Sequence, residues 1–308
     1  MNLVLHNRRF QAEIVSEIGG NVISLRHLES GTPLLREPPD MDELRKYPEQ
    51  FGMPVLFPPN RIDHGQFYFE GKHCFLPVTE IKMDNHLHGL AVGKKWLVTA
   101  SDETSAEMQF TFSPDCPEYE GFPFAFRLTR KVNLNGHGLT DEMTVVNQGR
   151  INMPLGLGYH TTFPAAGAQV RLSTGDREYE IGERNLPTGK MLDWKEFDPR
   201  KFFDPNGRIV GFHTTTETMS LEDGRTLHGA EIRYGCGLLR YLTDEKFGFW
   251  YTWNRKGQGD FISLEPVRWM ANALNTPDTP EKTGVRTLAP GAQIRFRNEL
   301  VFEPGEKH

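Results

Sequence analysis

The sequence has few cysteines, no long apolar run and no excess of positive charge. Its 308 residues include only Cys74, Cys116 and Cys236, which are widely spaced and form no C-x-x-C pair. Neither a disulfide framework nor a cysteine-based zinc site is therefore expected, and a reducing compartment fits best. No run of about 18 apolar residues is present, and residues 1–8 contain no extended apolar leader. We expect a cytoplasmic protein that does not act on a membrane.

The formal net charge is −6, which argues against nucleic acid or an anionic membrane surface as a partner. Hydrophobic residues make up 37% of the chain and aromatic residues 11%, enough for a sizeable core. The length corresponds to roughly one or two domains, but all-β architectures run longer as one unit. We therefore expect one domain over residues 1–308.

The chain also lacks an amphipathic helix of any length, an internal repeat and a low-complexity tract. A short helix is expected only at residues 41–47. Aromatic and β-branched runs separated by turn residues predict antiparallel strands and an all-β fold. The expected strands are residues 67–69, 74–77, 96–100, 108–112, 124–134, 139–146, 208–212, 218–221, 229–234, 238–242, 247–253 and 294–302. The segments 176–208 and 266–290 have no clear periodicity and are expected to be long loops.

A short apolar run, residues 261–264, ends in Glu265 and Pro266. The run predicts a buried strand, and Pro266 is expected to end its pairing because proline has no N–H to donate. Glu265 then lies at a strand end. Such a carboxylate is either exposed to solvent or a general base in a cleft, and the second interpretation requires acid partners elsewhere in the chain.

Polar residues in two earlier segments are candidates for substrate binding. Asn60 and Arg61 follow two prolines that stiffen the chain, and an amide beside a guanidinium suits sugar hydroxyls or a carboxylate. A capped loop with a surface arginine is the alternative. His86 and His88 share one face if their segment is a strand, but no nearby ligand pattern completes a metal site. We expect His88, next to Gly89, to project into a cleft while His86 points elsewhere.

His160 is the candidate proton donor. It follows an apolar stretch interrupted by Gly156 and Gly158, which indicates a strand that another backbone or a ligand approaches closely. An imidazole with aromatic neighbours in a semi-dry site would titrate near neutral pH. The alternative is a core histidine bonded to the backbone.

Together these segments resemble the aldose 1-epimerase (galactose mutarotase-like) family. The resemblance rests on motifs in the family's order and rough spacing: Asn60-Arg61-Ile62 followed by a Phe-Tyr-Phe-x-Gly strand and turn, Asn85-x-Leu87-His88-Gly89, Gly158-Tyr159-His160, and Leu264-Glu265-Pro266 with Asn272-Ala273 downstream. It implies a large β-sandwich of antiparallel sheets. The implied activity is the interconversion of the α and β anomers of a free aldose without cofactor or metal, with the sugar as the partner.

The resemblance also implies roles for individual residues. Glu265 matches the family's base and His160 its acid, as ring opening requires one proton to leave the C1 hydroxyl and another to reach the ring oxygen. Arg61 and His88 would hold hydroxyls near the ring oxygen, and Asn60 would orient the sugar.

The sequence departs from the family at three places. Residues 210–213 occupy the place where family members carry a sugar-binding Asp, but contain none. Leu90 replaces the usual second glycine after the His-Gly pair, and residues 176–208 match no family feature, so the wall of the cleft is expected to differ.

Three other functions stay open. A hexose-6-phosphate 1-epimerase needs basic residues at the cleft mouth, and Lys94, Lys95, Arg177, Arg184 and Arg268 are available but scattered. A carbohydrate-binding protein of the same fold would need no acid and base. A glycoside hydrolase normally requires two carboxylates, and only Glu265 is nominated.

Overall fold

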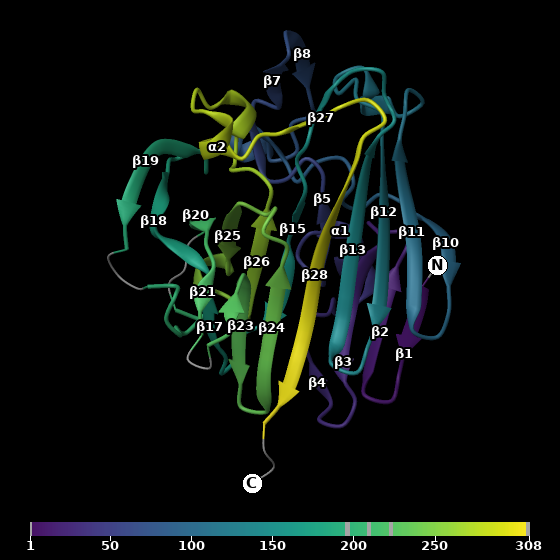
Figure 1. Ribbon diagram of the computed structural model, residues 1–308, viewed down its shortest axis with the longest axis vertical. Helices are drawn as coiled ribbons and strands as arrows, with labels where there is room; N and C mark the ends of the chain where they lie inside the picture. Colours follow the sequence, from purple (N-terminus) through teal and green to yellow (C-terminus); the bar gives the residue numbers. More distant parts are fainter. Residues whose placement is uncertain (1, 195–197, 208–210, 222–223, 306–308) are drawn as a thin grey trace.

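The computed structural model describes residues 2–194, 198–207, 211–221 and 224–305. Within these residues one large antiparallel sheet has eight strands, and β28 runs lengthwise between β13 and β24 (Figure 1). In spatial order its strands are β10 (Leu97–Ser101), β11 (Ser105–Phe112), β12 (Phe126–Leu134), β13 (Gly138–Asn147), β28 (Gln293–Pro304), β24 (Gly237–Thr243), β23 (Gly229–Tyr234) and β17 (Gln169–Leu172).

A second eight-stranded antiparallel sheet contains Glu265, in β26, and the strands on either side of His160. Its strands follow the order β19 (Pro187–Asp193), β18 (Thr174–Ile181), β20 (His213–Thr216), β25 (Phe249–Trp253), β26 (Phe261–Val267), β15 (Gly158–Tyr159) and β5 (Val55–Leu56), and β16 (Thr161–Pro164) also pairs with β26.

Smaller sheets and short helices complete the described chain. They are a four-stranded sheet of β1 (Asn2–His6), β2 (Phe10–Val15), β3 (Asn21–His27) and β4 (Thr32–Pro33); the pairs β6 (Arg61–Asp63) with β9 (Asn85–Leu87), β7 (Gln66–Phe69) with β8 (Lys72–Phe75), β14 (Met153–Pro154) with β27 (Thr287–Leu288), and β21 (Met219–Ser220) with β22 (Thr226–Leu227); helices α1 (Met41–Lys46) and α2 (Pro280–Thr283); and 3₁₀ turns at Ile81–Met83, Pro117–Tyr119, Arg255–Gly257 and Ala273–Asn275. No helix in the described residues is both long and apolar enough to cross a membrane.

The two large sheets pack face to face over a shared apolar core. Tyr241 of β24 lies 6.0 Å, between ring centroids, from Trp250 of β25, and its hydroxyl accepts a hydrogen bond from Thr161 of β16 at 2.9 Å. The same core joins Phe126 of the first sheet to Ile262 of the second. Alternating inward residues of both sheets therefore form a sandwich, and the expected all-β antiparallel sandwich is confirmed.

The short helix expected at residues 41–47 is present as α1. Asp40 caps it, since its carboxylate accepts hydrogen bonds from the backbone N–H groups of Asp42 and Glu43 at 2.9 and 2.8 Å. These contacts satisfy two of the N–H groups that a helix start leaves without an intrahelical partner.

The prediction that Pro266 ends its strand is wrong, because β26 continues to Val267. Pairing with β16 stops at Leu264 and pairing with β15 resumes at Val267. The missing N–H of Pro266 therefore falls in a gap of the ladder, where it costs little. Glu265 consequently lies inside a strand and not at its end.

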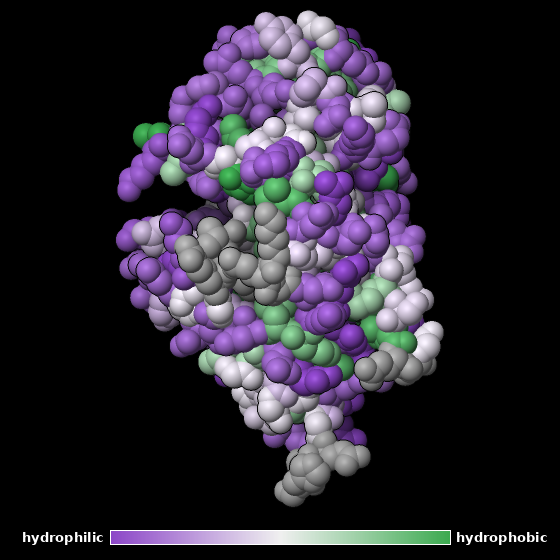
Figure 2. Space-filling view, turned by 90° about the vertical axis from the view of Figure 1, so that its left-hand side faces the viewer, coloured by the Kyte–Doolittle hydropathy of each residue, from purple (hydrophilic) through white to green (hydrophobic). Residues whose placement is uncertain are grey.

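The long loop expected at residues 176–208 is also wrong in its first half, which contains most of the β18–β19 hairpin. These strands form one edge of the sheet and expose residues on both faces, so they lack the alternation of apolar and polar residues that marks a half-buried strand. Of the strand expected at residues 208–212, residues 208–210 lie outside the described residues, and the next strand, β20, begins at His213. The face of the molecule on the β18–β19 side is mainly hydrophilic (Figure 2).

Candidate active site

Arg61 and His88 are brought together by the pairing of β6 with β9. Arg61 faces Leu87 in this pair, and the N–H of His88 donates to the carbonyl of Asn60 at 3.1 Å. Gly89 has a φ of +80°, and a Cβ there would lie 2.3 Å from the carbonyl carbon of Phe57. Glycine is therefore needed for the turn after His88 to pack against the chain that leads to Arg61.

His160 joins β15 to β16, and its backbone N–H donates to the carbonyl of Pro54 at 3.1 Å. At Gly158 a Cβ would lie 2.7 Å from the Val267 side chain and 2.8 Å from that of Pro59. The close approach predicted from the glycines is thus confirmed. It brings His160 next to β26, the strand of Glu265.

Glu265 is 1% exposed, so the interpretation as a solvated carboxylate is wrong. Its Oε1 lies 3.1 Å from Nε2 of His160 and accepts a hydrogen bond from the hydroxyl of Ser263 at 2.8 Å. His88 stands on the other side of His160, with ring centroids 5.2 Å apart and an interplanar angle of 83°. The structure therefore places a buried carboxylate and two imidazoles in contact.

Three buried atoms of this group have no hydrogen-bond partner within the described part of the chain. They are Oε2 of Glu265, Nδ1 of His160 and Nδ1 of His88. A buried polar atom without a partner costs about 1–3 kcal/mol, which a ligand that supplies the partner would recover.

Arg61 is held by a residue that the sequence did not single out. Its Nε and Nη2 donate to the two carboxylate oxygens of Glu80, both at 2.8 Å, and its Nη1 donates to the hydroxyl of Tyr251 at 3.4 Å. Burial alone would raise the pKa of Glu80, but the hydrogen bond and charge of Arg61 lower it below its usual value. The guanidinium is thereby fixed in one orientation.

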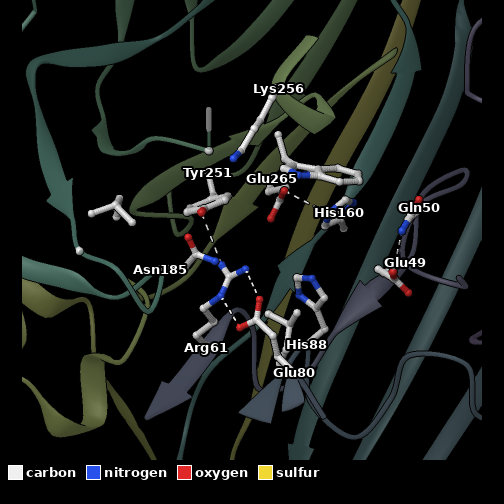
Figure 3. Close-up of a pocket in the computed structure, with 15 residues that line it drawn as sticks. Glu49, Gln50, Arg61, Glu80, His88, His160, Asn185, Tyr251, Lys256 and Glu265 are labelled. Atoms are coloured by element: carbon white, nitrogen blue, oxygen red, sulfur yellow. Dashed lines mark hydrogen bonds and ion pairs between the residues drawn. The ribbon is translucent and has the colours of Figure 1, made fainter. Parts of the chain in front are cut away.

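The expected residues Glu265, His160, His88 and Arg61 all line one cavity of about 500 Å³ (Figure 3). This volume is in the range of roughly 300–1,000 Å³ of small-molecule sites. The full lining consists of Glu49, Gln50, Arg61, Glu80, Leu87, His88, His160, Ile181, Gly182, Asn185, Gly211, Tyr251, Trp253, Lys256 and Glu265.

Asn60 does not belong to this lining, although it was expected to contact the ligand. It is 1% exposed, and its side-chain oxygen accepts a hydrogen bond from the N–H of Arg61 at 2.8 Å. Asn60 therefore contributes to the loop that carries Arg61. The five basic residues considered for a phosphate site, Lys94, Lys95, Arg177, Arg184 and Arg268, also lie outside the lining.

Sequence reasoning missed Glu80, Asn185, Tyr251 and Lys256. Each lies in a stretch without a recognisable motif, and only the fold brings them to the cavity. Lys256 projects toward Tyr251 and Glu265 in Figure 3. No sequence motif identifies these residues. They line the same cavity as the four expected residues.

Burial determines the charge state of His88. Removal from water lowers its pKa well below the usual value, and the nearby His160, Arg61 and His86 act in the same direction. His88 is therefore neutral near pH 7. Burial likewise raises the pKa of Tyr251, so its hydroxyl stays protonated and available as a donor.

His86 points away from this cavity, as expected. Its Nδ1 lies 2.7 Å from the carbonyl oxygen of Pro77, and it is not among the lining residues. The described residues contain no group of three or more His, Cys, Asp or Glu side chains arranged to hold a metal ion.

Comparisons with known proteins give the family. The family model described as aldose 1-epimerase matches residues 1–298. A galactose mutarotase-like protein from Clostridium acetobutylicum superposes with a TM-score of 0.92 at 25% identity, covering 99% of this chain and 95% of that one.

Two curated proteins of Escherichia coli K12 are also similar. The uncharacterized protein YihR is 34% identical over 108 residues, which is 34% of each chain, so the match spans about a third of that protein. The uncharacterized protein YphB is 22% identical over 252 residues, covering 79% of this chain and 81% of that protein. Since the family model matches nearly the whole chain and the fold agrees, this protein belongs to the aldose 1-epimerase family.

Proposed function

We propose that the protein interconverts the α and β anomers of a free aldose by general acid–base catalysis. The observation that carries this proposal is the buried contact of 3.1 Å between Nε2 of His160 and Oε1 of Glu265 on the wall of the cavity. One base and one acid are what ring opening requires, and both lie within reach of the same small molecule. The family membership supports the same reaction.

The proposed steps return each group to its starting state. Glu265 removes the proton from the C1 hydroxyl while His160 gives a proton to the ring oxygen. The bond between C1 and the ring oxygen breaks, and C1 becomes a carbonyl. After rotation about the C1–C2 bond the new hydroxyl attacks the other face of the carbonyl, returning its proton to His160 as Glu265 returns the first proton to the C1 oxygen.

Arg61 and His88 are proposed to hold the sugar. The Glu80 carboxylate occupies Nε and Nη2 of Arg61, so Nη1, which bonds the Tyr251 hydroxyl at 3.4 Å, has a second N–H left for a sugar hydroxyl. His88 is neutral near pH 7, which lets it donate one hydrogen bond and accept another. Asn60 is proposed as a positioning residue that acts through its hydrogen bond to Arg61.

Lys256 favours a second candidate, an aldose that carries an anionic group such as a hexose 6-phosphate. It lies on the turn Arg255–Gly257, where its φ is 58°, and the turn is held by the side chain of Asn254, whose oxygen accepts from Gly257 N–H at 3.2 Å. The ammonium group of Lys256 projects into the cavity toward Tyr251 and Glu265 (Figure 3). Among the lining residues a phosphate would meet the ammonium of Lys256 and the guanidinium of Arg61, which is already paired with Glu80, and not a cluster of unpaired basic residues.

Polarimetry tests the proposal. The optical rotation of freshly dissolved α-anomers of glucose, galactose, arabinose and glucose 6-phosphate is followed with and without the protein. For at least one sugar we expect the rate constant of equilibration to increase in proportion to the protein concentration. Acceleration of glucose 6-phosphate alone would favour the second candidate. Sugar binding measured by titration calorimetry without any acceleration would mean a carbohydrate-binding protein and would overturn the proposed catalysis.

A further inference from the structure

The turn between β18 and β19 supplies part of the cavity wall. β18 ends at Ile181 and β19 begins at Pro187, and the turn is closed by a hydrogen bond from Gly182 N–H to the carbonyl of Leu186 at 2.8 Å. Ile181, Gly182 and Asn185 line the cavity. Asn185 has a φ of 57°, a left-handed conformation that asparagine tolerates better than most residues.

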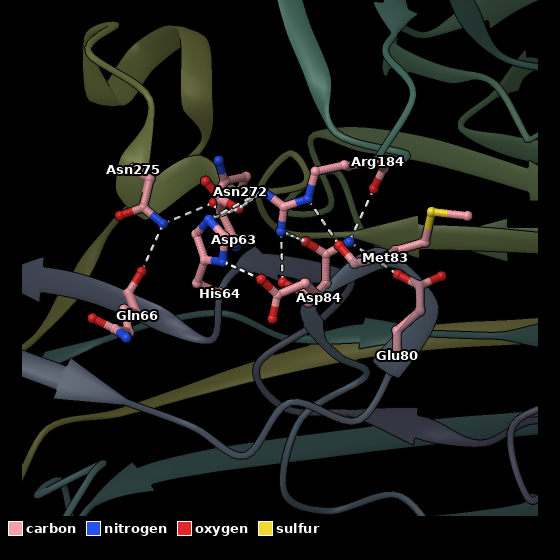
Figure 4. A network of polar contacts seen from close by, with 10 residues as sticks. Asp63, His64, Gln66, Glu80, Met83, Asp84, Arg184, Asn272 and Asn275 are labelled. Carbon is pink, nitrogen blue, oxygen red and sulfur yellow. Dashed lines mark hydrogen bonds and ion pairs between the residues drawn. The ribbon is translucent and has the colours of Figure 1, made fainter.

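Arg184 fixes this turn to the segment that carries Arg61 (Figure 4). Its Nε donates to the carbonyl of Met83 at 2.9 Å, and its Nη2 donates to the carbonyl of Asp84 at 2.6 Å and to the Asn85 side chain at 3.1 Å. Its Nη1 forms an ion pair with Asp63. The guanidinium thus bridges the residues that end β6 and begin β9.

The backbone carbonyl of Arg184 also accepts a hydrogen bond from the segment to which its guanidinium donates. The side-chain N–H of Asn85 donates to the carbonyl of Arg184 at 2.9 Å and also to Oε2 of Glu80 at 3.0 Å. The turn is therefore held from two sides, and several contacts must break together before it can move. This geometry sets the position of the next residue in the chain, Asn185.

The side chain of Asn185 lies beside the guanidinium of Arg61, which Glu80 holds from another side (Figure 3). A carboxamide offers two donors and one acceptor with two lone pairs, so it has capacity left for a ligand. Hydroxyl groups of a sugar are both donors and acceptors. A fixed amide on the wall of a sugar-sized cavity is suited to distinguish a hydroxyl from its absence or its inverted configuration.

We propose that Asn185 is a specificity-determining residue that binds one hydroxyl of the aldose, and that Arg184 is the residue that positions it. This inference rests on the proposed function in that the ligand is an aldose. The wall at Asn185 carries a neutral group, so the sugar substituent that it recognises is a hydroxyl and not a phosphate or a carboxylate.

The test uses a set of monodeoxy analogues of the best-bound aldose. Titration calorimetry on the wild type and on Asn185→Ala should show a loss of affinity of roughly 3- to 10-fold for the parent sugar, the value of one neutral hydrogen bond. One deoxy analogue, the one that lacks the recognised hydroxyl, should bind equally to both proteins. In turnover assays the change should appear in KM, with kcat altered less than about 2-fold.

Arg184→Ala should reproduce the same pattern, with the loss confined to the same hydroxyl. In the Asn185→Ala background it should cause no further loss, because a positioning residue acts only through the group that it positions. The matched control is Lys190→Ala, which removes an exposed cation of the same hairpin whose Nζ lies 3.2 Å from Glu180. This control should bind and convert sugars as the wild type does.

The inference is overturned if folded Asn185→Ala binds the parent sugar like the wild type, or if it loses the same factor for every analogue. If Arg184→Ala fails to fold, the inference can still be tested, because the Asn185→Ala variant tests it directly. If the wild-type protein binds aldoses but does not accelerate mutarotation, the proposed catalysis is wrong. The binding titrations would still test whether Asn185 recognises a hydroxyl. Wild-type protein that binds no aldose would overturn both.

Discussion

Two buried polar pairs of the described residues, Arg130 with Asp141 and His160 with Glu265, differ in how completely their atoms are bonded. Arg130 of β12 and Asp141 of β13 are both fully buried, with Nε and Oδ1 2.8 Å apart, and Nη1 of Arg130 also donates to the carbonyl of Gly20 at 2.8 Å. His160 and Glu265 are almost as buried, at 5% and 1% exposure of their side chains. They border a cavity, and each retains an atom without a partner among the described residues.

The difference separates a buried pair that serves the fold from one whose atoms are available to a ligand. The charges of Arg130 and Asp141 compensate each other within the core, and the cost of their desolvation is met by direct hydrogen bonds. The free atoms of His160 and Glu265 leave a cost that the fold itself does not offset. Burial alone thus does not mark a site, whereas burial with unmet hydrogen bonds beside a cavity does.

The largest effect is expected from Glu265→Gln. The amide has nearly the same shape and still bonds Ser263, but it cannot accept the C1 hydroxyl proton, so turnover should fall by about 10²- to 10⁴-fold. The free energy of unfolding should change by less than about 1 kcal/mol. Polarimetry and urea denaturation on the same sample measure both. Near-wild-type turnover by the folded variant would remove Glu265 as the base.

Arg130→Met should show the opposite pattern. It leaves Asp141 buried without a counter-charge, so the free energy of unfolding should fall by about 3–5 kcal/mol, while kcat of the protein that remains folded should stay close to that of the wild type. The double variant Arg130→Met/Asp141→Leu is the control. Because it removes both charges, it should regain most of the free energy of unfolding that the single variant loses. A stable single variant would contradict the structural role of this pair.

The two histidines of the site should separate binding from proton transfer. His160→Asn should lower kcat by about 10²-fold with KM within a few-fold, because it removes the proton donor. His88→Asn should raise KM by roughly 3- to 10-fold, because a neutral group that holds the sugar contributes one hydrogen bond. Steady-state kinetics on both variants decide the assignment, and the reverse pattern would exchange the two roles.

The smallest effect concerns His213, which lies outside the cavity lining although its Nε2 also lacks a partner within the described chain. Burial lowers the pKa of His213 to about 3. Below the unfolded value of about 6.5 the unfolded chain therefore binds one more proton than the folded protein, and stability falls as the pH falls toward about 3. This group contributes a slope of about 1.4 kcal/mol per pH unit in that window.

His213→Phe should flatten the dependence by that amount, and urea denaturation at pH 4 to 7 measures it. Mutarotation at pH 7 should change little, since His213 is not among the residues that line the cavity and phenylalanine keeps a ring against Tyr251, whose centroid lies 5.8 Å from that of His213. An unchanged slope would mean that His213 is protonated in the folded protein. The lack of a hydrogen-bond partner would then not distinguish the atoms of the cavity residues from those of a core histidine.

Much of the fold follows from local sequence. Turn residues between aromatic and β-branched runs predicted the hairpins β7–β8 and β12–β13, and Asp40 before a short polar run explains α1. The errors at Pro266 and at the β18–β19 hairpin have a common cause. Whether a proline fits, or whether a polar strand pairs, depends on which strand lies alongside, and that strand comes from elsewhere in the chain.

The sequence by itself determined the antiparallel β architecture, and its short motifs predicted five site residues, of which Arg61, His88, His160 and Glu265 line one cavity while Asn60 does not. Only the tertiary structure decided that Glu80 holds Arg61, that Tyr251 lies 190 positions away yet within hydrogen-bonding distance of it, and that Asn185 reaches the same cavity. The physical reason is the range of the interactions. Turns, caps and strand propensities act between neighbours, but a cavity is lined by side chains whose proximity exists only once distant strands have paired.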